Sequence, residues 1–219
     1  MSKYVSRVIF DVASRKDFET RNIEARSVSI TTADNEKLEV ILSSDTMETL
    51  GSDFKVKIDE SRSDFEIAVV RSRNVAEEAA VEGLDVEIIF PKDMIGDLEF
   101  KLNCNELTIK DIECRNMEFG GIVKELTLEN VSSKIELDIR ADMTIRASDV
   151  TGSIEINQIS SESVLEVPSD FSFRSVTEGT GNEIRYEKDG VPSDDFSDRS
   201  SETTVELNGR KSILTIRRI

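Results

Sequence analysis

Carboxylates are the side chains of this sequence with the most scope for chemistry, because the 219-residue chain contains no histidine. Without histidine, neither a Ser-His-Asp nor a Cys-His nucleophile can be assembled. Two carboxylates could serve a glycosidase, but the chain has 45 acidic residues and no pair stands out by its position. We therefore assign no catalytic, cofactor-binding or metal-binding residue and expect no cofactor and no enzymatic activity.

Two groups of acidic residues have spacings that could suit a cation. One group occupies the same place in three similar segments and would form a column if those segments stacked: Glu106, Glu125 and Asp142. The other is a loop cluster: Asp194, Asp195 and Asp198. Solvent and nearby basic residues would screen the column, and the loop lacks the EF-hand pattern. We expect neither group to hold a metal.

Cys104 and Cys114 are the two cysteines of the chain. Two cysteines do not make a disulfide framework in a protein of this length, and there is no histidine to complete a Cys/His metal set. We expect both to be reduced and partly buried. A bridge between them requires their strands to be neighbours, which the sequence leaves open.

The elements that must position these residues are short strands that repeat between Leu98 and Val167. Segments of the form acid, aliphatic, Thr, aliphatic recur, each followed by Asp or Asn and a branched residue. This first series comprises Glu106–Ile109, Glu125–Leu128 and Asp142–Ile145. A second series lies between them: Met117–Phe119, Ile135–Ile139 and Ile154–Ile156. Two interleaved series at a shared period indicate a repeated supersecondary unit.

Stacking of these units predicts which side chains share a column. The aliphatic residues should point inward, and an outer column should comprise Thr108, Thr127 and Thr144. Corners should be formed by short polar residues, which tolerate left-handed backbone geometry: Asp111, Asn130 and Asp149. Further tight corners are expected at Gly120-Gly121 and Gly152.

The rest of the chain is less regular. Strand patterns occur over residues 28–70. The segment from Asn74 to Gly83 is expected to be either a short helix, with Asn74 as its cap and Gly83 as its end, or a polar loop. A strand over Val86–Phe90 should end at Pro91. We divide the chain into an N-terminal extension or first strand (1–26) and a repetitive domain (27–219), with repeats clearest over 98–167 and closing strands over 202–219.

These patterns predict an all-β fold, a parallel β-helix-like solenoid with a less regular N-terminal β region. An antiparallel meander would show Asn-Gly or Asp-Gly turns between its strands. The pairs of this kind, Asp189-Gly190 and Asn208-Gly209, lie beyond the repeats. Coil stacked upon coil, each burying its apolar face against its neighbours, fits the pattern better.

Several motifs together resemble the putative-adhesin family, a group of bacterial repetitive β-domains. The resemblance spans roughly residues 28–219 and is concentrated in three motifs: Val86–Lys92, Val150–Ile156 and Leu165–Pro168 followed by Phe171. Most of the Gly-Asp steps of the family are absent, and Asn103–Asn105 and Ser132–Lys134 stand in their places. The resemblance implies a right-handed solenoid, an adhesin label and no catalytic residues to carry over.

Charge and apolar patterning limit the partners that we expect. A net charge of −17 repels nucleic acid and anionic lipid, and no stretch is long enough to insert into a membrane. The N-terminus lacks a signal-peptide pattern, which favours the cytoplasm, whereas the family resemblance implies the cell surface. The family resemblance implies an adhesin-like binding module, and we expect its ligand to be a protein or a glycan. The alternatives are a cytosolic scaffold that self-assembles into homo-oligomers and, third, a carbohydrate-active enzyme.

Overall fold

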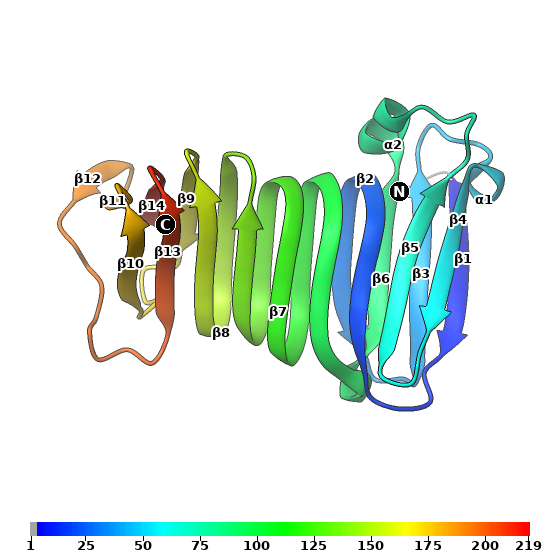
Figure 1. The fold of residues 1–219 in the computed structure, drawn as a ribbon, viewed down its shortest axis with the longest axis horizontal. Coiled ribbons are helices and arrows are strands. Elements are labelled where there is room, and N and C mark those ends of the chain that lie inside the picture. Colours follow the sequence, from blue (N-terminus) through cyan, green and yellow to red (C-terminus); the bar gives the residue numbers. More distant parts are fainter. Residues whose placement is uncertain (1–3) are drawn as a thin grey trace.

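The computed structural model describes residues 4–219, and nearly all of its regular structure is β (Figure 1). The strands of the N-terminal part are β1 (Tyr4–Asp11), β2 (Lys16–Ala33), β3 (Lys37–Ser44), β4 (Phe54–Glu60), β5 (Asp64–Arg71) and β6 (Asp85–Pro91). The middle contains β7 (Ile95–Ile139), β8 (Met143–Ile159) and β9 (Glu162–Val167). The C-terminal part contains β10 (Arg174–Thr180), β11 (Glu183–Lys188), β12 (Val191–Ser193), β13 (Thr204–Arg210) and β14 (Ile213–Arg218). The helical segments are short: α1 (Leu50–Asp53), α2 (Glu77–Gly83) and η1 (Lys92–Met94). The prediction of an all-β chain is confirmed.

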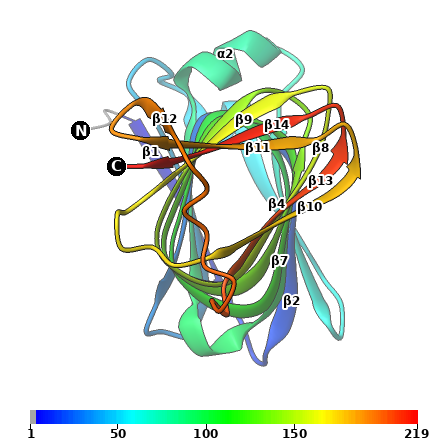
Figure 2. The ribbon, with the colours of Figure 1, turned by 90° about the vertical axis from the view of Figure 1, so that its left-hand side faces the viewer.

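The middle of the chain winds in successive coils that stack on one another (Figures 1 and 2). Strand β8 pairs in parallel with β7 at a constant offset of 19 residues, so that Leu126 lies beside Ile145 and Ile135 beside Ile154. Strand β9 adds to β8 in parallel, and β2 lies in parallel on the other side of β7. The long strands β7 and β8 run continuously round the bends between faces, as Figure 1 shows.

Alternating side chains build the core, because successive residues of a strand point to opposite faces. Along the first repeat series, Leu107, Ile109, Leu126 and Leu128 are buried, whereas Thr108 and Thr127 are half-exposed. The registers place equivalent residues in apolar rows through the interior, one of which comprises Leu126, Ile145, Leu165 and Ile216. Each coil therefore buries its apolar face against the coils on either side.

The polar corners adopt the predicted backbone geometry. Asp111, Asn130 and Asp149 have φ values of 57°, 53° and 51°, in the left-handed region that short polar side chains tolerate. Asn130 Nδ2 also donates a hydrogen bond to Asp111 Oδ1 at 2.7 Å, which links one coil to the next. The corner prediction is confirmed at all three positions.

Two of the predicted corner glycines are required by close contact between coils. Gly121 and Gly152 have φ values of +150° and +106°, and a Cβ at either position would lie 2.0–2.1 Å from a carbonyl oxygen of the preceding coil. Gly120 has no such constraint, because a Cβ there would meet no atom within 4 Å. Gly121 and Gly152 therefore let neighbouring coils approach where a side chain would not fit.

The predicted threonine column is wrong in its third member. The register places Arg146 beside Thr127, and Thr144 beside Glu125, so the repeat keeps its 19-residue offset where the sequence motif suggested 17. A shift of two residues leaves every side chain on the same face of the strand, and the inward aliphatic positions Met143 and Ile145 are buried as expected.

The N-terminal end of the stack is closed by antiparallel strands. Strand β1 pairs with β3, β3 with β6, and β4 with β5, while β5 and β6 join β2 in parallel. Strand β2 crosses the predicted boundary at residue 26 without a break, and the two-part division stays a prediction. The predicted helix begins later than expected: α2 starts at Glu77, with Ala76 at its N-cap and no side-chain cap from Asn74.

The C-terminal strands do not close the stack in chain order. Strands β13 and β14 form within the predicted region 202–219, but they pair with β8 and β9 on one side and with β10 and β11 on the other. The coil formed by β13 and β14 comes last in the sequence, but it lies between the coil of β8 and β9 and the coil of β10 and β11. Aromatic residues cover the outermost coil, where Phe196 packs edge-on against Phe173 and Tyr186 and beneath the guanidinium of Arg218. Figure 2 shows the segment between β12 and β13 crossing this end.

Candidate functional site

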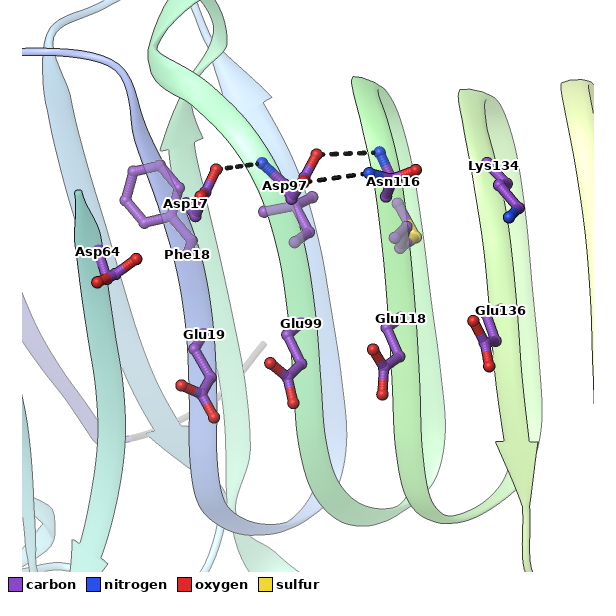
Figure 3. Close-up of a pocket in the computed structure, with 12 residues that line it drawn as sticks. Asp17, Phe18, Glu19, Asp64, Asp97, Glu99, Asn116, Glu118, Lys134 and Glu136 are labelled. Carbon is purple, nitrogen blue, oxygen red and sulfur yellow. Dashed lines mark hydrogen bonds between the residues drawn. The ribbon is translucent and has the colours of Figure 1, made fainter.

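A row of carboxylates crosses one outer face of the stack, one from each successive strand. We call it the acid ladder, and it comprises Asp59, Glu66, Glu19, Glu99, Glu118, Glu136, Glu155 and Glu206. Direct strand pairing joins Glu66 to Glu19, Glu19 to Glu99, Glu136 to Glu155 and Glu155 to Glu206. Figure 3 shows Glu99, Glu118 and Glu136 in one line with Glu19. Neighbouring strands lie roughly 4.8 Å apart, which sets the spacing of the carboxylates.

The strands position these carboxylates by alternation. The residues that flank the ladder positions on the same strands, Phe18, Leu98 and Met117, are buried, so each intervening glutamate must point to solvent. One ladder residue per coil follows from the repeat. The ladder is therefore a direct product of the same pattern that forms the core.

An open groove of about 500 Å³ lies along the ladder from Glu19 to Glu136 (Figure 3). Its opposite rim is a second row of polar residues: Asp64, Asp17, Asp97, Asn116 and Lys134. Hydrogen bonds fix part of this rim, since Asp17 Oδ1 accepts from the backbone N–H of Asp97 at 2.8 Å and Asn116 Nδ2 donates to Asp97 at 3.1 Å. The Arg115 guanidinium also bonds Asp97 and holds the pKa of that carboxyl below its ordinary value.

Basic residues neutralise the ladder at its N-terminal end. Arg21 forms ion pairs with Glu19 and Glu66, and Lys101 with Glu19 and Glu99. The hydrogen bond from Arg21 is the main cause that lowers the pKa of Glu19. This end of the ladder therefore has its own counter-charges.

The other end of the ladder carries charge without such partners. Within the described part of the chain, no ion pair involves Glu118, Glu136, Glu155 or Glu206. Burial raises the pKa of Glu118, and repulsion by Glu99 and Glu136 raises it further. The pKa of Glu206 is likewise raised by burial and then by Glu155. Like charges one strand apart repel, so a positively charged group would stabilise this stretch.

The acidic column predicted from the sequence is not assembled. The register places Glu125 beside Thr144, and Arg146 Nη1 bonds Glu125 at 2.7 Å. Asp142 lies outside the strand and accepts the backbone N–H of Glu162 at 2.9 Å. The two-residue shift in register separates Asp142 from the column, so the predicted column of Glu106, Glu125 and Asp142 is wrong in its third member.

The loop cluster near residue 195 is used for local turns. Asp195 accepts the backbone N–H of Ser197, and Asp198 accepts that of Ser200, both at 2.8 Å. Across residues 4–219 as described, no group of three or more acidic or cysteine side chains has a geometry that could hold a metal ion. Both aspartates have lowered pKa values, and for Asp198 the main cause is its hydrogen bond from Ser200.

Both cysteines are free and buried, as expected for reduced side chains. Burial raises the pKa of Cys104 to about 12 and also raises that of Cys114, which leaves both thiols protonated near neutral pH. Cys104 Sγ bonds the Glu106 carbonyl at 3.2 Å. Both side chains are part of the hydrophobic core.

The acid ladder was only partly visible in the sequence. Glu118, Glu136 and Glu155 are each the second residue of a segment of the second repeat series, and that recurrence was the available signal. Glu19, Glu66 and Glu206 lie outside the repeats and reach the ladder only through the fold. Pairing between distant strands supplies them.

Comparison with known proteins gives similarity at the level of structure alone. No protein-family model and no curated protein matches the chain. A putative cell adhesion protein from Clostridium sporogenes is similar at 13% identity and a TM-score of 0.45, covering 99% of this chain and 100% of that one. A putative adhesin from Bacteroides fragilis is similar at 11% identity and a TM-score of 0.38, covering 100% and 98%. The chain resembles structures described as putative adhesins.

The structures similar to this chain also include one with a different description. It is a putative lipid binding protein from Parabacteroides distasonis, at 7% identity and a TM-score of 0.33, covering 98% of this chain and 97% of that one. In the described residues of the present chain, no helix is long and apolar enough to cross a membrane.

Proposed function

We propose that this chain is a non-enzymatic, adhesin-like binding module built on a right-handed parallel β-helix-like solenoid. Parallel pairing at a constant 19-residue offset and apolar rows that run through successive coils support the solenoid. The family resemblance of the motifs in Val86–Lys92 and Val150–Ile156 supports the adhesin-like class and its right-handed winding. A place at the cell surface is part of this proposal.

The acid ladder is the binding face in this proposal, and its ligand is a protein segment that presents lysine or arginine side chains. The observation that carries it is the stretch from Glu118 to Glu206, whose carboxylates lack ion-pair partners among the described residues. Alternate side chains of an extended segment lie roughly 6.6 Å apart, so long lysine and arginine side chains would have to span the difference from the roughly 4.8 Å spacing of the carboxylates. The rigid stack fixes the carboxylates before binding, which reduces the entropy cost of recognition.

The test is binding of a labelled hexa-arginine peptide, measured by fluorescence anisotropy at low and physiological salt. The variant E118Q/E136Q/E155Q removes three ladder charges. We expect it to bind at least about tenfold more weakly than the unmodified chain, because three charge-assisted contacts are lost. Binding should also weaken as salt rises.

A matched control separates the ladder from net charge. The variant E77Q/E78Q/E82Q removes the same charge from helix α2, whose residues do not line the groove. It should bind the peptide within about twofold of the unmodified chain, since screening limits the reach of exposed charges to roughly 10 Å. Equal losses in the two variants would show that only net charge attracts the peptide and would overturn the proposal.

A further inference from the structure

Four strands of the described structure, β1, β4, β10 and β12, each pair along one edge only, and they differ in the side chains they present. Edge strands usually carry charges, and lysine above all, because a bare apolar edge recruits other strands. Strand β4 follows this rule with exposed Lys55 and Lys57. The exposed side chains of β10 are charged or small. Strand β12 is three residues long and contains Pro192, which has no backbone N–H to donate to another strand. Strand β1 departs from the rule.

The outward face of β1 combines apolar and charged residues in alternation. Val5, Arg7, Ile9 and Asp11 are exposed, whereas the side chains between them are partly buried. Val5 is 63% and Ile9 46% exposed, which places both among the most exposed large apolar residues of the described chain. Figure 1 shows β1 at the end of the stack. An edge strand with exposed branched residues is a template for pairing with another strand.

We propose that β1 pairs in antiparallel fashion with β1 of a second copy of this chain, about a two-fold axis at Ile9. In this register Ile9 lies opposite Ile9 of the second copy, and Arg7 of each copy lies opposite Asp11 of the other. All these side chains point to the same face, as cross-strand neighbours must. The pairing is isologous, so it closes at a dimer.

Charge selects this register over the nearest alternatives. An axis at Arg7 would place Arg7 opposite itself, and directly opposed like charges are destabilising. An axis at Val8 would place Arg7 opposite Ile9 and leave both charged groups without a cross-strand partner. Only the axis at Ile9 joins an apolar pair with two opposite-charge pairs.

The two charged side chains remain accessible for this role. Arg7 is 53% exposed while it bonds Glu39 within its own chain, and a guanidinium has donors to spare for a second carboxylate. Asp11 is 89% exposed and lies 3.7 Å from Lys37, so most of its surface still faces solvent. Neither side chain must leave its present partner for the dimer to form.

The test is the molar mass of the full chain in solution, measured by size-exclusion chromatography with light scattering over a range of concentrations. We expect a dimer that forms as concentration rises. The variant I9K should weaken it at least about tenfold, because it places two lysines opposite each other. The control I122K changes another exposed isoleucine, on β7, and should leave the dimer unchanged.

A charge swap tests the register. R7D alone or D11R alone opposes like charges across the axis and should weaken the dimer, whereas R7D/D11R restores opposite charges and should recover it. A monomer at every concentration, or a dimer that I9K leaves intact, would overturn the proposal. Failure of the double swap to recover a dimer lost in the single variants would overturn the register.

This inference is independent of the acid ladder. The variant E118Q/E136Q/E155Q should dimerise as the unmodified chain does, and I9K should bind the basic peptide as the unmodified chain does. Either proposal can therefore fail alone.

Discussion

At the scale of single residues, the left-handed corners restrict which residue types the stack accepts. Asn130 has a φ of 53° and donates to Asp111. We expect N130A to lower the free energy of unfolding by about 1–2 kcal/mol, because alanine keeps the Cβ that crowds the carbonyl in this conformation but lacks the polar side chain that makes the conformation tolerable for asparagine. N130G should cost less, since glycine adopts this φ without strain. Urea denaturation of both variants measures the difference. Equal losses would assign the effect to the hydrogen bond with Asp111 instead.

The corners could be predicted from the sequence, whereas the register of Thr144 could not. Asp or Asn recurs at 111, 130 and 149 at the period of the coils, and few other residue types tolerate that backbone geometry. Thr144 matched the motif of Thr108 and Thr127, but it lies two residues from the equivalent position. Apolar alternation has a period of two, so it cannot distinguish registers that differ by two residues.

At the scale of strands, burial of Glu118 and repulsion along the acid ladder should together make stability depend on pH. The pKa of Glu118 is raised in the folded chain, so the folded state binds this proton more tightly than the unfolded state. Its contribution to stability therefore becomes more favourable as pH falls from neutral toward the ordinary glutamate pKa of 4.5. Removal of the Glu118 charge by substitution should likewise stabilise the folded state at neutral pH.

We accordingly expect E118Q to stabilise the protein at pH 7 by about 0.2–1 kcal/mol, the usual range for a cross-strand pair, and to raise the Tm by roughly 1–3 °C. The gain should shrink toward about pH 4.5, where the natural side chain is itself protonated. Thermal melts at both pH values measure it, with E113Q, an exposed residue off the ladder, as the control. A gain that is the same at both pH values would exclude ladder repulsion as its cause.

Local patterns predicted the strands well but not all of their neighbours. The second repeat series supplied three members of the ladder, while Glu19, Glu66 and Glu206 join through pairings between strands far apart in sequence. The helix start illustrates the same limit. Asn74 had the right type for a cap, yet α2 begins at Glu77 and packs against β2.

At the scale of the whole molecule, the outermost coil, formed by β10 and β11, should depend for its stability on the inserted coil formed by β13 and β14. Strands β10 and β11 pair with β13 and β14 and with no other repeat strand, so they lose those partners when residues 204–219 are deleted. We expect residues 174–203 to exchange amide hydrogens rapidly in that variant, while the coils up to Val167 stay protected. Hydrogen exchange with mass spectrometry measures this.

Deletion of Ile219 alone provides the control, because this residue follows β14. It should leave the protection of β10 and β11 intact. Protection of residues 174–203 in the longer deletion would mean that β10 and β11 can pair directly with β8 and β9 in place of the missing strands.

A stack of parallel coils could be predicted from the repeats, but the order of its last coils could not. The segment Leu214–Ile216 has the aliphatic-Thr-aliphatic pattern of the repeats, and this pattern fits either face of a neighbouring coil equally well. The connection before β13 runs over residues 194–203, and the cost of closing a loop rises only slowly with its length, so the loop places little restriction on which strand β13 reaches.

The inserted coil also sets the order in which the protein can be completed during its synthesis. The ribosome releases β10 and β11 before the strands on which they must rest, so this part of the stack cannot grow by adding each new coil to the last. Residues 174–188 must therefore stay unpaired until β13 and β14 have been made. Alternatively, they first pair with β8 and β9 and are then displaced by β13 and β14. The nascent chain therefore reaches its final arrangement only after β14 has left the ribosome.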